Sequence, residues 1–222
     1  KDDLGTISTI LKANGYYFST VDVFKELNDD QNQINIIYKI DIGNKTKIKK
    51  IAFTGNKIYK DNKLKSLIIS EEYKPWKFIS GKKYLNESTI NFDLKLLKNF
   101  YLNKGYYNVE INSSFARLFD EDNFELIFNI NSNEKYYFNN LELILPQDFS
   151  EDNFSNIEEL FEDLKNKPYS LVRIKSILNN LDKISTNEQF ESVKSTVEET
   201  IVENKIDLKF IIEETEKIFV EK

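Results

Sequence analysis

The chain has 222 residues, 40% of them apolar and 31% charged, which allows one to three small globular domains and argues against a disordered segment. It contains no His, Cys or Met, which excludes a histidine base, a thiol nucleophile, a disulfide and a Cys/His zinc site. The net charge of −6 divides into −9 for residues 134–222 and +3 for residues 1–133, and such a chain is not expected to bind nucleic acid.

An internal repeat begins in the first part of the chain. Gly15-Tyr16-Tyr17 is followed by an alternating apolar run from Ile34 to Ile40. The same pattern returns ninety positions later as Gly105-Tyr106-Tyr107 and the run from Phe124 to Ile130. A third copy of the run, Ile206 to Ile212, lies 82 positions beyond the second. A period this long predicts a string of small domains and not a solenoid of short repeats.

The repeat sets the expected domain boundaries near residues 44 and 133. We expect the C-terminal part of one domain in residues 1–44 and complete domains in residues 45–133 and 134–222. Because the chain opens at Lys1 without Met, we also expect it to be a fragment of a longer protein.

The middle repeat predicts the order strand, helix, helix, strand, strand. Ile48 to Thr54 alternates as a strand, and Gly55-Asn56 ends it in a turn. A short helix is expected from Asp61, followed by a longer one that Gly105 ends in the left-handed conformation. The apolar face of the longer helix consists of Ile90, Leu94, Leu97 and Tyr101.

The segment Tyr107–Leu118 alternates with period two and predicts a strand. The returning strand, Phe124–Ile130, is the more continuously apolar of the pair and should therefore be central, which leaves Tyr107–Leu118 at the sheet edge. Side chains expected to face the helices are Tyr107, Val109, Ile111 and Phe115; those expected to face water are Asn108, Glu110, Asn112 and Ser114.

The last repeat predicts the same order of elements. A strand is expected over Phe138–Leu145, helices around Phe154–Leu164 and Leu171–Leu181, and two strands near Phe190–Glu199 and Ile201–Ile212. Each complete unit is thus an α+β domain in which two helices cover one face of a three-stranded mixed sheet.

The middle unit resembles the POTRA domain of the Omp85 family of outer-membrane assembly proteins. The matching residues are Ile51-Ala52-Phe53-Thr54-Gly55-Asn56, Pro75-Trp76, Gly81, Lys83-Tyr84, Asp93-Leu94, Leu97, Tyr101-Leu102 and Gly105-Tyr106. The set is most similar to the third domain of such an array, so residues 1–44 would be the end of the second domain and residues 134–222 the fourth.

The resemblance implies a function in protein binding and not in catalysis. Such domains lie in the periplasm, linked to a C-terminal β-barrel in the outer membrane that this chain lacks. They receive unfolded outer-membrane proteins and dock accessory lipoproteins, and they carry no catalytic residue and no cofactor. A two-partner secretion transporter or a TamA-like protein would share the domain and stays open as an alternative.

The edge strand is the candidate binding site. An open edge presents backbone groups on which an incoming strand can pair whatever its side chains. The residues assigned to this site are Tyr107, Asn108, Val109, Glu110, Ile111, Asn112, Ser113, Ser114 and Phe115. The alternative is an edge guarded against pairing, with Glu110 and Arg117 as the protecting charges.

Other conspicuous residues are expected to have structural roles. Trp76 should fill the edge of a local core, with an exposed contact residue as the alternative, and the pairs Glu71-Glu72 and Glu198-Glu199 should be solvated. A carboxylate-based hydrolase would need convergent acids, and the sequence shows scattered ones. The lysine-rich segment 45–65 is read as solvated surface; contact with anionic lipid headgroups or an acidic partner is the alternative.

Overall fold

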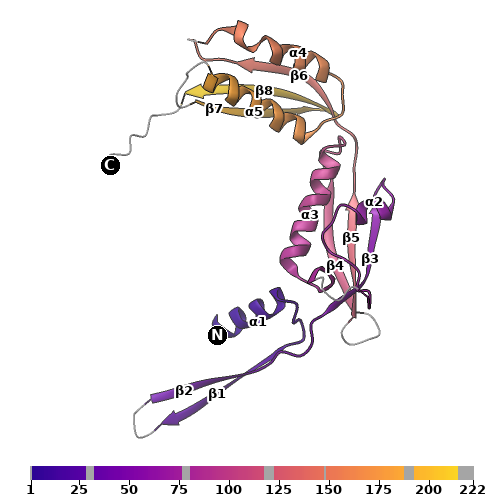
Figure 1. Cartoon of the computed structure of the whole chain (residues 1–222), viewed down its shortest axis with the longest axis vertical. Coiled ribbons are helices and arrows are strands. Elements are labelled where there is room, and N and C mark those ends of the chain that lie inside the picture. Colours follow the sequence, from indigo (N-terminus) through magenta and orange to yellow (C-terminus); the bar gives the residue numbers. More distant parts are fainter. Residues whose placement is uncertain are drawn as a thin grey trace. The chain divides into compact units, whose positions relative to one another are not determined.

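The fold is taken from a computed structural model, which describes residues 2–28, 33–76, 81–117, 123–147, 149–187 and 193–214 (Figure 1). In chain order, the first elements are helix α1 (Asp2–Ala13) and strands β1 (Thr20–Asn28) and β2 (Gln33–Asp41). The middle elements are β3 (Lys47–Asn56), α2 (Asp61–Lys65), the 3₁₀ turn η1 (Gly81–Lys83), α3 (Glu87–Leu102), β4 (Glu110–Arg117) and β5 (Asn123–Asn131). The last are β6 (Tyr137–Ile144), η2 (Glu151–Phe154), α4 (Ser155–Leu164), α5 (Leu171–Asn187), β7 (Val193–Val202) and β8 (Lys205–Glu214).

The described strands form three separate sheets. Strands β1 and β2 make an antiparallel hairpin, and the other two sheets have the orders β3-β5-β4 and β6-β8-β7. In each of these two sheets the first strand pairs in parallel with the central strand, and the remaining strand pairs with it antiparallel. The predicted α+β class, with three-stranded mixed sheets and two helices per unit, is confirmed.

The core of the middle sheet follows directly from the period-two alternation of β5. Phe124, Leu126, Phe128 and Ile130 are buried, whereas the residues between them are half-buried or exposed. Phe128 stacks on Phe53 of β3 with ring centroids 5.5 Å apart. Helix α3 contributes further buried apolar residues, among them Ile90 and Leu97. Central position and dense apolar alternation therefore coincide, as predicted.

The last sheet is built in the same way. Ile206, Leu208, Phe210 and Ile212 of β8 are buried. They form one hydrophobic cluster with α4 and α5, in which Phe161 stacks on Phe210 at 5.3 Å. Strands β7 and β8 meet at Val202 and Lys205, so the turn lies a few residues later than the predicted break near residue 200.

The two Gly-Tyr-Tyr motifs form the same turn. Gly15 and Gly105 have φ angles of +92° and +94°, the left-handed conformation that ends a helix without a side-chain clash. The carbonyl of Gly15 accepts a hydrogen bond from the Thr46 N–H at 2.9 Å, and that of Gly105 accepts one from the Tyr136 N–H at 2.8 Å. The ninety-residue repeat of the sequence is therefore also a repeat of backbone hydrogen bonds.

The chain divides into two compact units. One unit contains Lys1–Lys98 and Glu110–Asn131, and the other contains Asn99–Val109 and Ser132–Lys222. The turn after α3 thus belongs with the last sheet, because Gly105 bonds to Tyr136. The boundaries at residues 44 and 133 remain a prediction.

The hairpin β1–β2 exposes apolar side chains that its counterparts bury. Ile34 and Ile36 are 59% and 54% exposed, although the residues ninety positions later, Phe124 and Leu126, are buried. Among the described residues β2 pairs with β1 alone, whereas β5 and β8 each pair with two strands.

Candidate polypeptide-binding edge

The middle sheet has two outer strands, β3 and β4, because β5 lies between them. An outer strand carries backbone N–H and C=O groups that point away from the sheet, and these groups can pair with another chain. The two edges differ in whether these outward groups already have hydrogen-bond partners within the described chain.

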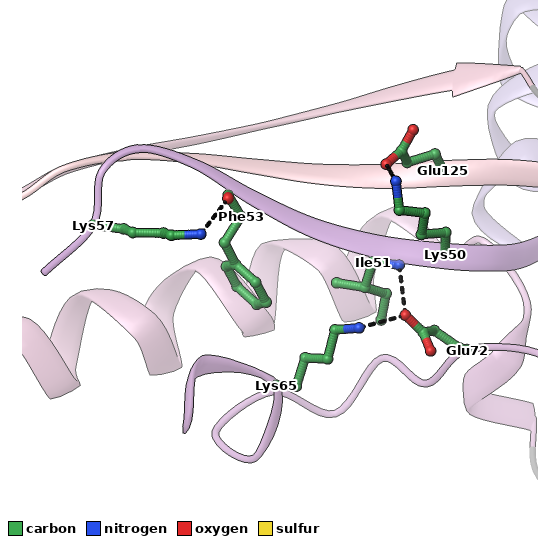
Figure 2. A network of polar contacts seen from close by, with 7 residues as sticks. All are labelled: Lys50, Ile51, Phe53, Lys57, Lys65, Glu72 and Glu125. Carbon is green, nitrogen blue, oxygen red and sulfur yellow. Dashed lines mark hydrogen bonds and ion pairs between the residues drawn. The ribbon is translucent and has the colours of Figure 1, made fainter. Parts of the chain in front are cut away.

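The outer edge of β3 is occupied by groups from the same chain (Figure 2). The Ile51 N–H donates to a carboxylate oxygen of Glu72 at 3.0 Å, and the Phe53 carbonyl accepts from the Lys57 ammonium at 2.8 Å. The Ile48 carbonyl accepts from the Tyr73 N–H at 2.6 Å. These bonds use positions that a neighbouring strand would need.

Glu72 is held at this edge by charge as well as by geometry. The Lys65 ammonium lies 2.6 Å from the same carboxylate oxygen that binds the Ile51 N–H. Burial by itself raises the pKa of Glu72, but the hydrogen bonds from Lys65 and Ile51 and the charges of Lys65 and Lys74 outweigh it, so the pKa lies below its ordinary value of 4.5. Glu72 is ionised at neutral pH, and with its side chain 28% exposed and bound to Ile51 and Lys65 it is not the solvated residue that the sequence predicted.

The outer edge of β4 is open within the described part of the chain. Strand β4 pairs antiparallel with β5 from Glu110 to Arg117, and no described side chain or loop outside β5 hydrogen-bonds to it. The corresponding outer strand of the last sheet, β7, is less open, because its Ser195 N–H donates to Asp182 at 3.3 Å.

The register shows which N–H groups of β4 point outward. A strand residue sends its N–H and C=O to the same side. The backbone N–H of Ile51 points away from β5, so the N–H and C=O of Ala52 point toward β5. In a parallel pair these two groups bond to the two neighbours of the partner residue, and the partner of Ala52 is Ile127. The backbone N–H and C=O of Ile127 itself must then point toward β4, where the partner of Ile127 is Ser114. Ser114 therefore bonds to β5, and the N–H groups of Ile111 and Ser113 point outward.

The structure places the predicted site residues in two groups. Glu110, Ile111, Asn112, Ser113, Ser114 and Phe115 lie on β4, whereas Tyr107, Asn108 and Val109 lie in the turn before it. The predicted strand thus began three residues too early. Asn108, Glu110, Asn112 and Ser114 are exposed as predicted, Val109 is buried, and Ile111 is half-buried. The side chains of Phe115 and Arg117, and residue Leu118 altogether, lie outside the described part.

Tyr107 is not part of the strand because it belongs to an aromatic cluster. Its ring lies 4.9 Å from Tyr169 in an edge-to-face contact and 5.6 Å from Tyr136. Burial and a hydrogen bond to Glu199 raise the pKa of Tyr107 to about 12, and burial and the Glu199 charge also raise the pKa of Tyr169. Its role is to pack the turn against the last sheet, and Glu199 is not the solvated residue that the sequence predicted.

One residue has a structural role that the sequence did not indicate, and another differs from expectation. Asp93 is fully buried and accepts hydrogen bonds from the backbone N–H groups of Ile69 and Ser70 at 2.6 and 3.2 Å, so it fastens the segment before Glu72 to α3. Trp76 is 70% exposed, so the prediction that it fills a local core is wrong.

Neither a metal centre nor a membrane span is found in the described residues. No group of three or more acidic side chains there is arranged to hold a metal ion. No described helix combines the length and the apolar character needed to cross a membrane.

Comparison with known proteins gives one consistent family. The family described as "POTRA: Surface antigen variable number repeat" matches residues 46–133. The outer membrane protein assembly factor BamA of Buchnera aphidicola is 26% identical over 197 residues, which cover 86% of this chain and 31% of that protein. BamA of Neorickettsia risticii is 28% identical over 115 residues, or 52% of this chain and 15% of that protein. The chain thus spans less than a third of the length of these relatives.

A solved structure has the same fold. The POTRA3-5 crystal structure of Haemophilus influenzae BamA aligns with a TM-score of 0.58 at 15% identity, covering 96% of this chain and 79% of that one. At this identity the likeness establishes the fold and leaves the position of each domain within an array as a prediction.

Proposed function

This chain belongs to the POTRA-domain region of the BamA family of outer-membrane assembly factors, and from that premise we propose that it receives unfolded outer-membrane proteins by strand addition to β4. The incoming segment pairs with the outward backbone groups of Ile111 and Ser113. Its side chains are not selected, because main-chain pairing is the same for every sequence.

The observation that carries the proposal is the difference between the two edges of one sheet. The β3 edge is closed by Glu72, Tyr73 and Lys57, whereas the β4 edge has no such partners among the described residues. Within the described part of the middle sheet, the open edge of β4 gives an extended client a place to bind.

The energetics suit a receptor that must release its client. Each backbone hydrogen bond contributes about 0.5–1.5 kcal/mol net, so pairing along β4 supplies a few kcal/mol. The loss of translational and rotational freedom offsets much of this gain. Binding through β4 is therefore weak and reversible, as transfer of a client to the next site requires.

The remaining assignments belong to the same proposal. The chain works in the periplasm, has no enzymatic activity, and docks accessory lipoproteins of the assembly complex. Its parts are the end of a second POTRA domain in residues 1–44, the third in 45–133 and the fourth in 134–222. The recurrent turn at Gly15 and Gly105 and the three separate sheets support this division.

Photocrosslinking tests the proposal directly. A photoreactive amino acid is placed at Asn112, which is exposed on β4, and in a matched variant at Thr54, which is exposed on β3. The probe is a peptide of about ten residues that copies a membrane strand of an outer-membrane protein. We expect a crosslink from Asn112 and little from Thr54. Equal yields from the two positions, or none from Asn112, would reject β4 as the client site.

A further inference from the structure

The closed edge of β3 has the features of a strand-binding site that is already filled. Along its outer side, bonds to groups of the same chain begin at the Thr46 carbonyl, which accepts from the Leu85 N–H at 2.8 Å. They continue with the bond at Ile48. The bonds at Ile51 and Phe53 follow (Figure 2). Donors and acceptors of β3 are both used, as they would be in pairing with another strand.

We propose that β3 is a second, latent edge for extended polypeptides, kept closed by Glu72 and Tyr73, and that this closure directs clients to β4. The inference rests on the proposed strand addition and adds the residues that decide which edge takes part.

Glu72 and Tyr73 replace an incoming strand in complementary ways. The Tyr73 N–H supplies the donor for the Ile48 carbonyl, and the Glu72 carboxylate supplies the acceptor for the Ile51 N–H. A carboxylate is a stronger acceptor than the neutral carbonyl of a client. The closed state therefore competes well with client pairing.

Glu72 and Tyr73, which we call the latch residues, can break their hydrogen bonds to β3 without unfolding the segment that carries them. Asp93 holds the backbone of Ile69 and Ser70, and the Glu71 N–H donates to the Lys82 carbonyl at 3.0 Å. None of these bonds involves the side chain of Glu72. A change at Glu72 should thus open the edge while the start of the segment stays in place.

The experiment compares two lesions of the latch with a control. Glu72→Ala removes the acceptor for Ile51, and Tyr73→Pro removes the donor to Ile48, so the two act on different hydrogen bonds. Lys50→Gln, on the same strand as Ile51, is the control, because it removes the ion pair with Glu125 but leaves the Glu72 carboxylate on the Ile51 N–H. Each substitution is introduced into the Thr54 and Asn112 photoreactive chains, with the same outer-membrane strand peptide as probe, and each protein's fold is checked by circular dichroism.

We expect the Thr54 crosslink to rise about two- to tenfold in Glu72→Ala and in Tyr73→Pro, which corresponds to one hydrogen bond of the closed state. Lys50→Gln should leave the Thr54 yield low, and the Asn112 yield should persist throughout. If Asn112 crosslinks but neither folded latch variant raises the Thr54 yield, the latent edge is refuted and strand addition at β4 survives. If Asn112 crosslinks in none of the proteins, the proposed function itself fails.

Discussion

Gly55→Ala is expected to lower the free energy of unfolding of the unit that holds β3, β4 and β5 by about 2–5 kcal/mol. Gly55 has a φ angle of +81°, which side chains rarely adopt. An added Cβ would also lie closer to the Ile130 carbonyl oxygen than real Cβ atoms come, and 2.5 Å from Oδ1 of Asn129. Both belong to β5, whose backbone is fixed by pairing on both sides.

Substitutions at two other glycines separate the two causes of this lost stability, the positive φ angle and the steric contact with β5. Gly43 has a φ angle of +57° but open space around its Cβ position, so Gly43→Ala should cost about 1 kcal/mol. Gly81 has neither a positive φ nor a close neighbour, and Gly81→Ala should be almost neutral. Urea unfolding of the three variants measures the differences. A cost for Gly55→Ala no greater than that for Gly43→Ala would show that the contact with β5 is absent.

A pair of adjacent proline substitutions should have opposite effects on stability and binding. Ser114→Pro removes an N–H that bonds to β5 and should lower the free energy of unfolding by about 3 kcal/mol. Ser113→Pro removes an N–H that points outward, so it should change stability little, as proline is tolerated at such positions of edge strands. Because a client loses one hydrogen bond, its binding should weaken about two- to tenfold.

The measurements are thermal unfolding and the Asn112 crosslink yield in each variant. Ser113→Pro should retain the melting temperature of the parent and lose crosslink yield. The opposite outcome, an unstable Ser113→Pro with a stable Ser114→Pro, would mean that the backbone of β4 faces the other way and that its open side presents Ser114.

The repeat in the sequence was enough to predict the fold class and the position of β4. Alternation places Phe124, Leu126, Phe128 and Ile130 on one face of β5. A central strand is shielded from water by strands on both sides and by helices on one face, so the strand with more apolar residues takes the central place. Gly105 was predictable because few other residues tolerate a φ of +94°.

The closure of β3 could not be predicted from the sequence. Glu72 looks like one of two adjacent surface acids, and its role depends on the N–H of Ile51 and the ammonium of Lys65, which the fold brings to it. Tyr107 fits an alternating strand pattern, but its contacts with Tyr136 and Tyr169 keep it in the preceding turn. Tertiary contacts of this kind leave no local periodicity in the sequence.

Hydrogen exchange of the ¹⁵N-labelled chain, with and without the outer-membrane strand peptide, tests the central claim most directly. In the peptide's absence, the N–H groups of Ile111 and Ser113 should exchange rapidly, because no described group of the chain binds them. Addition of the peptide should protect both, while the N–H of Ile51, already bonded to Glu72, should change little. Protection of Ile51 without protection of Ile111 and Ser113, or no protection on any strand, would contradict the assignment of β4 as the client-binding edge.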